Sequence, residues 1–220
     1  TANETVGQYG IRNPLGGVAG WSEVYMNASL ESYLKGYNDP RIKSYFNLAQ
    51  DGRDKEGNII KEVAGVKQLN SIEGEYKGVR QGTGVADNRY STHSQTAITT
   101  GSKIIVMSAA EVWFLRAEAA LRNYTSENVE NCYKQGITVS FAQWDASGVS
   151  EYLESEETPA AYVDAFDKKF DADAPTSITP KWDESAPLEL KLERIITQKW
   201  LAIYPEGCEA WAEQRRTGYP

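Results

Sequence analysis

Hydrophobic and polar positions follow a helical period most regularly between Met107 and Trp144. Ser108 stands three residues before Glu111, the spacing at which a serine hydroxyl caps the free amides of a first helical turn. Behind this cap, apolar residues recur at steps of three and four; they are Val112, Trp113, Ala117, Ala119, Ala120 and Leu121. The pattern predicts a helix whose apolar face packs against a partner.

The partner is predicted in the next stretch of the chain. Ser126 is a second candidate for a helix cap, and apolar residues then repeat at helical spacing; they are Val129, Tyr133, Ile137, Phe141 and Trp144. Because the connection is short, the two helices are expected to be antiparallel neighbours. The sequence therefore predicts a helical hairpin at about residues 108–144.

The spacing within this hairpin agrees in part with the tetratricopeptide repeat, a helix pair of 34 residues. Trp113 and Ala117 match its large and small positions in the first helix, and Val129, Tyr133 and Gly136 match positions in the second. The closing proline of that repeat is missing. An ordinary helical hairpin with aromatic core residues remains the alternative.

Four further helices are predicted towards the end of the chain. A short one is expected near Val149–Leu153, and a second over residues 159–170, where aromatic and small residues repeat at helical spacing. From Pro187 a long amphipathic pattern runs to about Pro205, and another helix follows, so that a second hairpin is expected at about 187–216. Trp200 and Trp211 are expected to meet in its core.

Residues 50–106 differ in character, because glycine-rich turns separate short alternating runs. We expect a long loop-rich excursion with minor β strands, and loops of this length in compact domains are usually functional or disordered. The excursion combines aromatic rings with forked polar groups, which suit the apolar face and the hydroxyls of a sugar. The candidate ligand residues are Tyr76, Arg80, Asn88, Arg89 and Tyr90. The alternative is that these residues fasten the loop to its helical base.

Trp182 is a further candidate, since it follows a loop bracketed by two prolines. Its ring either faces a ligand or fills a gap between helices. Catalytic and metal sites have weaker support: His93, the only histidine, has no nucleophile motif beside it, and no zinc or calcium spacing is present. Carboxylate pairs suitable for a glycosidase occur in residues 145–184, but this segment is so acidic that they are expected by chance.

The formal net charge of the 220-residue chain is -8 at pH 7. Residues 145–184 hold eleven acidic and three basic residues, so this segment accounts for the whole excess. An acidic surface repels phosphate backbones, and nucleic acid is therefore not expected as a partner. The two cysteines, Cys132 and Cys208, are expected to be free thiols inside helices. No apolar run is long enough for a membrane helix.

Four stretches of the chain have recognisable patterns. They are Tyr33–Arg41, the turn Tyr76–Gly82 with the pattern YxGxRxG, Ser108–Leu121 with the sequence SAAEVWFLRAEAAL, and Ile196–Pro220. Together and in this order they resemble the SusD/RagB family of surface nutrient-binding lipoproteins, and the four motifs are far more specific together than any one of them. The resemblance implies a mainly α fold over a single domain, residues 1–220, with tetratricopeptide-like antiparallel helix pairs and no cofactor.

The same resemblance implies a function. Members of this family bind a glycan or related nutrient without catalysis and pass it to a SusC-like TonB-dependent transporter in the outer membrane. They are held on the cell-surface side by a lipid anchor, which these 220 residues do not contain. Relatives are about twice as long, so the chain is expected to be the C-terminal part of such a protein. A tetratricopeptide-like adaptor for protein partners is the alternative, and a glycoside hydrolase is a weaker one.

Overall fold

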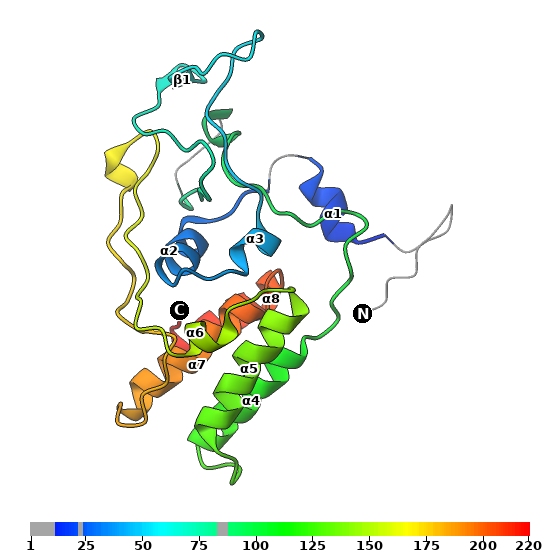
Figure 1. Ribbon diagram of the computed structural model, residues 1–220, viewed down its shortest axis with the longest axis vertical. Helices are drawn as coiled ribbons and strands as arrows, with labels where there is room; N and C mark the ends of the chain where they lie inside the picture. Colours follow the sequence, from blue (N-terminus) through cyan, green and yellow to red (C-terminus); the bar gives the residue numbers. More distant parts are fainter. Residues whose placement is uncertain (1–11, 22–23, 83–87) are drawn as a thin grey trace. The chain divides into compact units, whose positions relative to one another are not determined.

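A computed structural model of the chain describes residues 12–21, 24–82 and 88–220 (Figure 1). The described residues are mainly helical with two short strands, which confirms the predicted fold class. They form two compact units that are described separately. The loop-rich unit comprises Thr1–Gly36, Ile42–Ile104 and Pro159–Pro175, and the helical unit comprises Tyr37–Arg41, Ile105–Thr158 and Thr176–Pro220. The expected single domain over residues 1–220 stays a prediction.

The helical unit is built from two helix pairs and one short helix. Its elements are α4 (Ala109–Leu121), α5 (Val129–Gln143), α6 (Val149–Leu153), α7 (Leu188–Ala202) and α8 (Gly207–Thr217). Figure 1 shows α4 and α5 side by side, joined by a turn, and α7 packs against both of them. The helices at 149–153 and 188–202 lie where the apolar periodicity predicts them.

Side-chain caps determine where the first helix pair begins. The Ser108 hydroxyl accepts a hydrogen bond from the Glu111 amide at 3.0 Å, which confirms the predicted cap of α4. The cap of α5 is Asn128, whose Oδ1 accepts from the Asn131 amide at 2.8 Å, so the prediction of Ser126 is wrong. Asn128 directly precedes Val129, the first residue of the helix, so its side chain can reach a free amide of the first turn.

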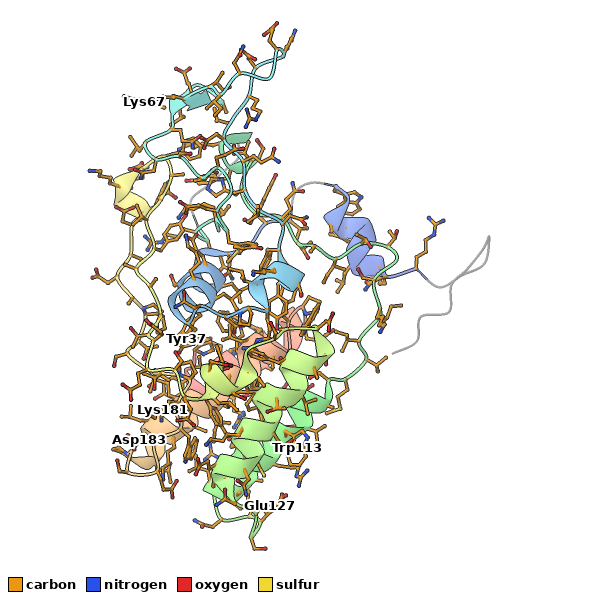
Figure 2. All side chains as sticks on the ribbon, in the orientation of Figure 1. Tyr37, Lys67, Trp113, Glu127, Lys181 and Asp183 are labelled. Carbon is orange, nitrogen blue, oxygen red and sulfur yellow. The ribbon has the colours of Figure 1, made fainter. Side chains whose placement is uncertain are left out.

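The centre of the α4–α5 pair is a contact between Phe114 and Gly136. Phe114 is fully buried, and a methyl group on Gly136 would lie 2.7 Å from the end of its ring. Glycine thus lets the two helices approach closely at this point. Trp113, which the repeat pattern favours as the core aromatic, is only partly buried, and its ring centre lies 3.8 Å from the guanidinium carbon of Arg116. Arg116 pairs with Glu127. Figure 2 labels Trp113 on the helix pair and Glu127 near the turn that joins α4 and α5.

The loop-rich unit carries short elements on long irregular connections. They are α1 (Pro14–Ala19), α2 (Ala28–Gly36), α3 (Ile42–Tyr45), the antiparallel strands β1 (Glu62–Val63) and β2 (Val66–Lys67), and two 3-10 turns at Asn88–Tyr90 and Lys168–Phe170. A small hydrophobic core joins parts of the unit that are far apart in the sequence. Its buried members are Ala49, Val63, Ile72, Tyr90, Ala165 and Phe166.

The predicted helix over residues 159–170 is wrong. This segment is irregular and ends in the 3-10 turn Lys168–Phe170, and Tyr162 exchanges two backbone hydrogen bonds with Ala172, at 2.8 and 2.9 Å. Asp164, Ala165 and Phe166 are buried one after another, which an α-helix with one apolar face would not allow. Contacts with the rest of the loop-rich unit therefore override the helical spacing of its apolar residues.

One expectation for the last helix pair is wrong, and the predicted free thiols are confirmed. Trp211 on α8 is 63% exposed, so its ring does not lie in a hairpin core with Trp200. Both thiols are free, and Cys132 is buried whereas Cys208 is exposed. Within the described ranges, no helix is both long and apolar enough to span a bilayer.

Candidate functional site

The turn that contains Tyr76 and Arg80 runs beside the chain that enters α2. The Val79 amide donates to the Met26 carbonyl at 2.8 Å, and the Ala28 amide donates to the Val79 carbonyl at 3.0 Å. A side chain at Gly78 would lie 2.5 Å from a backbone oxygen at Asn27. Glycine is therefore required inside the YxGxRxG pattern because two backbone segments approach here.

A buried ion pair between Lys77 and Glu31 of α2 anchors the same turn. Lys77 Nζ lies 2.8 Å from Glu31 Oε1, and the Gly78 amide donates to Glu31 Oε2 at 2.7 Å. Both side chains are less than a tenth exposed, and the Lys77 ammonium also lies 4.4 Å from the centre of the Tyr162 ring. The carboxylate thus satisfies a buried charge and a backbone amide together, and this holds the turn against α2.

Asp164 is the centre of a second buried network in the loop-rich unit. Its carboxylate accepts hydrogen bonds from the Phe166 amide at 2.8 Å and from the Asp167 amide at 3.0 Å. The hydroxyl of Tyr162 lies 3.0 Å from both Asp164 Oδ2 and the Gly78 carbonyl. Burial, followed by the nearby Asp164 charge, raises the pKa of Tyr162 well above its ordinary value, so the phenol keeps its proton and can donate it.

Tyr90 belongs to this network. Its ring is 2% exposed and packs edge-on against Phe166 and His93, with centres 5.5 and 4.9 Å away. Its hydroxyl lies 3.3 Å from the Asp164 carboxylate. As a ligand contact Tyr90 stays a prediction, and its burial supports the alternative that it fastens the loop.

The other predicted residues of the excursion are more accessible. Arg80 is exposed, and Nη1 donates to the Phe170 carbonyl at 3.2 Å, the one partner recorded for this guanidinium in the described part of the chain. Tyr76 is partly buried, which raises the pKa of its phenol, and Arg89 is partly exposed on the 3-10 turn. Asn88 opens that turn, and residues 83–87 lie outside the described ranges. Tyr76 and Arg80 are thus the accessible groups on one anchored turn.

Trp182 lies in the helical unit and is 7% exposed. Its ring centre is 5.1 Å from that of Tyr133, and its indole N–H donates to Glu184 at 2.9 Å. Tyr133 in turn donates to the Pro180 carbonyl at 2.6 Å. These contacts support the interpretation of Trp182 as a residue that fills a gap between elements, and its role in ligand binding stays a prediction.

The sequence pattern did not single out the residues that anchor the turn. Glu31 and Lys77 are distant in the chain, and Tyr162 lies in the segment for which the spacing predicts a helix. Asp164 is one of many carboxylates in the acidic segment, although it is fully buried. The glycine of the YxGxRxG pattern was the available signal, because it marks a close backbone approach that needs supporting contacts.

The accessible ring of Tyr76 and the guanidinium of Arg80 are groups suited to binding a polar ligand. In the described ranges, no group of three His, Cys, Asp or Glu side chains is placed to hold a metal ion. His93 is 2% exposed, and burial, followed by repulsion from Lys77, lowers its pKa to about 3. It is therefore neutral at physiological pH and packed between aromatic rings.

Comparison with known proteins gives one family. The family model described as SusD-like, "Susd and RagB outer membrane lipoprotein", matches residues 1–220. No curated protein sequence matches. A solved SusD homologue from Bacteroides vulgatus ATCC 8482 is 42% identical, with a TM-score of 0.81 over 99% of this chain and 42% of that one.

Two other solved structures are similar. A chitin-binding SusD homologue from Flavobacterium johnsoniae is 38% identical, with a TM-score of 0.81 over 95% of this chain and 40% of that one. A SusD-like protein from Bacteroides thetaiotaomicron VPI-5482 is 35% identical, with a TM-score of 0.77 over 96% of this chain and 41% of that one. The chain therefore spans about two fifths of the length of these relatives.

Proposed function

The chain belongs to the SusD and RagB family of outer-membrane lipoproteins, and from this premise we propose that it takes part in non-catalytic binding of a glycan or related nutrient at the cell surface. The observation that carries the proposal is the similarity to a chitin-binding homologue, 38% identical over 95% of this chain. Identity at this level over nearly every described element supports a shared mode of action as well as a shared fold.

The accessible groups of the loop-rich unit are the proposed glycan contacts. Tyr76 provides part of an aromatic face, and the forked guanidinium of Arg80 provides donors for sugar hydroxyls. The Glu31–Lys77 pair and the required Gly78 hold both residues on one turn, which reduces the entropy lost when a ligand binds. Arg89 and Asn88 are proposed to add polar contacts from the neighbouring 3-10 turn.

Delivery to a TonB-dependent outer-membrane transporter is the second part of the proposal. It rests on membership of a family described as outer-membrane lipoproteins. The transporter would accept the glycan unchanged, and no covalent step is assigned to this chain. A lipid anchor would hold the full-length protein on the cell-surface side of the outer membrane.

A glycan array followed by calorimetry tests the binding. The samples are the natural full-length protein and this 220-residue chain, with a nucleic acid and a set of peptides as control ligands. Binding of the same glycan by both samples would place contacts within these residues. Binding by the full-length protein alone would assign this chain a supporting role. If neither binds a glycan but a peptide binds, the adaptor alternative replaces the proposal, and release of sugar products would indicate a hydrolase.

A further inference from the structure

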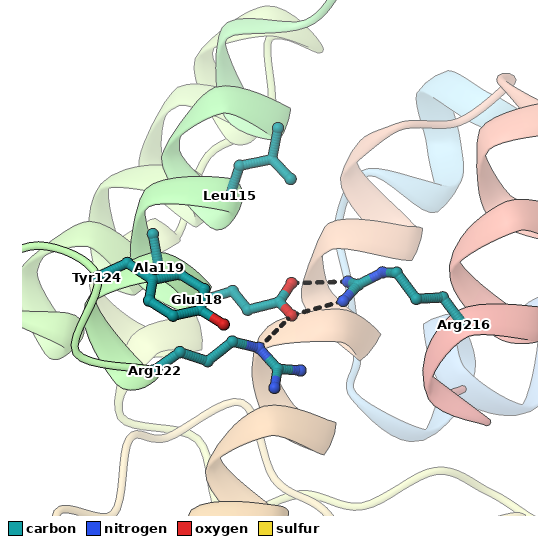
Figure 3. A pocket seen from close by; sticks show the side chains of 6 residues that line it. All are labelled: Leu115, Glu118, Ala119, Arg122, Tyr124 and Arg216. Carbon is teal, nitrogen blue, oxygen red and sulfur yellow. Dashed lines mark hydrogen bonds and ion pairs between the residues drawn. The ribbon is translucent and has the colours of Figure 1, made fainter.

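A pocket of about 420 Å³ lies in the helical unit between the end of α4 and α8 (Figure 3). We call it the α4-end pocket, and its lining residues are Leu115, Glu118, Ala119, Arg122, Tyr124 and Arg216. Its volume is within the range of about 300–1,000 Å³ typical of small-molecule sites. None of the six ligand residues predicted from the sequence lines it.

The backbone at the end of α4 holds the Tyr124 side chain in this pocket. Asn123 adopts a left-handed conformation with φ of 61°, and its amide donates to the Ala120 carbonyl at 2.9 Å. The Tyr124 amide then donates to the Ala119 carbonyl at 2.8 Å. These two bonds form a Schellman motif, which fixes the direction of the chain after the helix. Tyr124 is nevertheless 78% exposed, so its ring presents a flat face to solvent.

Three charged side chains also line the pocket. In Figure 3 the Glu118 carboxylate lies between the guanidinium groups of Arg122 and Arg216. Glu118 Oε1 is 2.8 Å from Arg122 Nε and 2.6 Å from Arg216 Nη1, and Oε2 is 2.7 Å from Arg216 Nη2. Burial alone would raise the pKa of Glu118, but the two arginines outweigh it and hold the pKa below its ordinary value. The carboxylate is therefore ionised and able to accept a further hydrogen bond.

Arg122 keeps part of its hydrogen-bonding capacity. Its Nε is bonded to Glu118, whereas in the described part of the chain no protein partner is recorded for its two Nη atoms. A planar guanidinium with two open amino groups can donate to two neighbouring hydroxyls at once. The pocket thus combines an exposed aromatic face, an open fork of donors and an ionised acceptor.

The charges of these groups indicate what kind of ligand fits. Arg122 and Arg216 are balanced by Glu118 and by Glu213, which lies 2.6 Å from Arg216. A balanced set does not favour a phosphate or an acidic sugar, and the chain as a whole carries a charge of -8. A neutral pyranose has a C–H face that can stack on the Tyr124 ring. Its hydroxyls can accept hydrogen bonds from Arg122 and donate one to the Glu118 carboxylate.

We propose that the α4-end pocket is a secondary binding site for one neutral pyranose residue of a glycan chain. This inference rests on the proposed glycan-binding function and adds a site and a ligand class to it. Another pocket of the helical unit, of about 300 Å³, does not offer the same combination, because its two tyrosines, Tyr37 and Tyr152, are buried.

A secondary site changes the binding of long chains more than that of short ones. Once a polysaccharide is bound elsewhere on the protein, the other sugar residues of the same polysaccharide are present near the pocket at a high effective concentration. The gain appears as tighter binding of the polymer without a change in the affinity for a disaccharide that fills one site. Loss of the pocket should remove this gain alone.

The test compares variants of the natural full-length protein by calorimetry. The probes are the neutral polysaccharides that the wild type binds on the array, each with its own disaccharide. Tyr124→Ala removes the ring, and Arg122→Met keeps the apolar stem but removes the fork. Trp211→Ala and Arg215→Met are the matched controls, since Trp211 and Arg215 are exposed on α8 and do not line the pocket. Thermal unfolding checks that each variant is folded.

We expect Tyr124→Ala and Arg122→Met each to weaken polysaccharide binding by about threefold to tenfold, the range for an aromatic contact. Disaccharide binding and both control variants should match the wild type. Polysaccharide binding by folded Tyr124→Ala at wild-type affinity would overturn the secondary site and leave the proposed function standing. A wild-type protein that binds no glycan would overturn both.

Discussion

Arg41 Nε lies 2.9 Å from Asp39 Oδ1, and both side chains are completely buried in the helical unit. Arg41 Nη1 also donates to the Ser140 hydroxyl at 2.8 Å, and the guanidinium carbon lies 4.9 Å from the centre of the Phe141 ring. An arginine in this sequence context could bind a ligand anion or nearby backbone. In the structure the guanidinium binds the side chains of Asp39 and Ser140, and these contacts hold the start of this unit to α5.

Breaking this pair should destabilise the protein strongly. Arg41→Met leaves the Asp39 carboxylate buried without its cation, and loss of one partner of a buried pair costs about 3–5 kcal/mol. Urea unfolding of the variant and the wild type measures the difference in the free energy of unfolding. Lys181→Ala is the control in the same unit, because its pair with Glu156 is exposed and should contribute less than about 1 kcal/mol. Equal decreases in the free energy of unfolding of the two variants would contradict the prediction that the buried pair matters more than the exposed one.

The contact between Phe114 and Gly136 gives a second prediction. Gly136→Ala would place a methyl group 2.7–2.9 Å from three atoms of a ring that has no room to move, since Phe114 is fully buried. Overpacking of this kind costs about 1–3 kcal/mol, more than the gain in helix propensity. Chemical denaturation measures the change.

Gly207→Ala is the matched control for Gly136→Ala. Gly207 opens α8, and no atom lies within 4 Å of the added methyl group. We expect a change between zero and a stabilisation of about 1 kcal/mol, because alanine restricts the unfolded chain. A stabilising Gly136→Ala would show that the two helices move apart at little cost.

His93 gives a prediction for the pH dependence of stability. Its pKa is about 3 in the folded protein, because burial and then Lys77 disfavour the charged form, and about 6.5 in an unfolded chain. Between these values the unfolded state binds a proton that the folded state does not, so stability decreases as the pH falls from about 6.5 towards 3. Above about pH 6.5 neither state is protonated and the effect disappears.

His93→Leu isolates this contribution, since the chain has no other histidine. Between pH 7 and pH 4.5 the wild type should lose about 2–3 kcal/mol more than the variant in the free energy of unfolding. Urea titrations at both pH values measure the free energy of unfolding of each protein. The carboxylates contribute equally to the pH dependence of both proteins, so their contribution cancels when the two losses are subtracted. The same loss in both proteins would show that His93 is protonated in the folded state.

Arg80 is the most direct test of the proposed glycan contacts. Arg80→Met in the full-length protein should weaken binding of the array-selected glycan about tenfold, the effect of losing one hydrogen bond from a charged donor, about 1.5 kcal/mol. Arg53→Met is the control, because Arg53 is an exposed arginine of the same unit that pairs with Glu73. Calorimetry that gives equal affinities for the two variants would remove Arg80 from the site.

The sequence by itself determined the features that depend on neighbouring residues along the chain. Ser108 caps α4 as predicted, because a cap depends only on residues in the first helical turn. The helix of residues 188–202 forms where the apolar residues recur at helical spacing, which is also a pattern of neighbouring residues. The stretch Ser108–Leu121 and the YxGxRxG turn also identified the family, which the family model over residues 1–220 confirms.

Tertiary structure decided the features that depend on distant residues. The segment of residues 159–170 has helical spacing but forms no α-helix, because Tyr162 pairs with Ala172 and the Asp164 carboxylate accepts hydrogen bonds from buried groups. In the same way, the Glu31 carboxylate meets Lys77 across 46 positions of the chain. Burial and buried charge pairing arise only when such residues are brought together by folding, so no local pattern could separate the accessible Arg80 from the buried Tyr90 and Trp182.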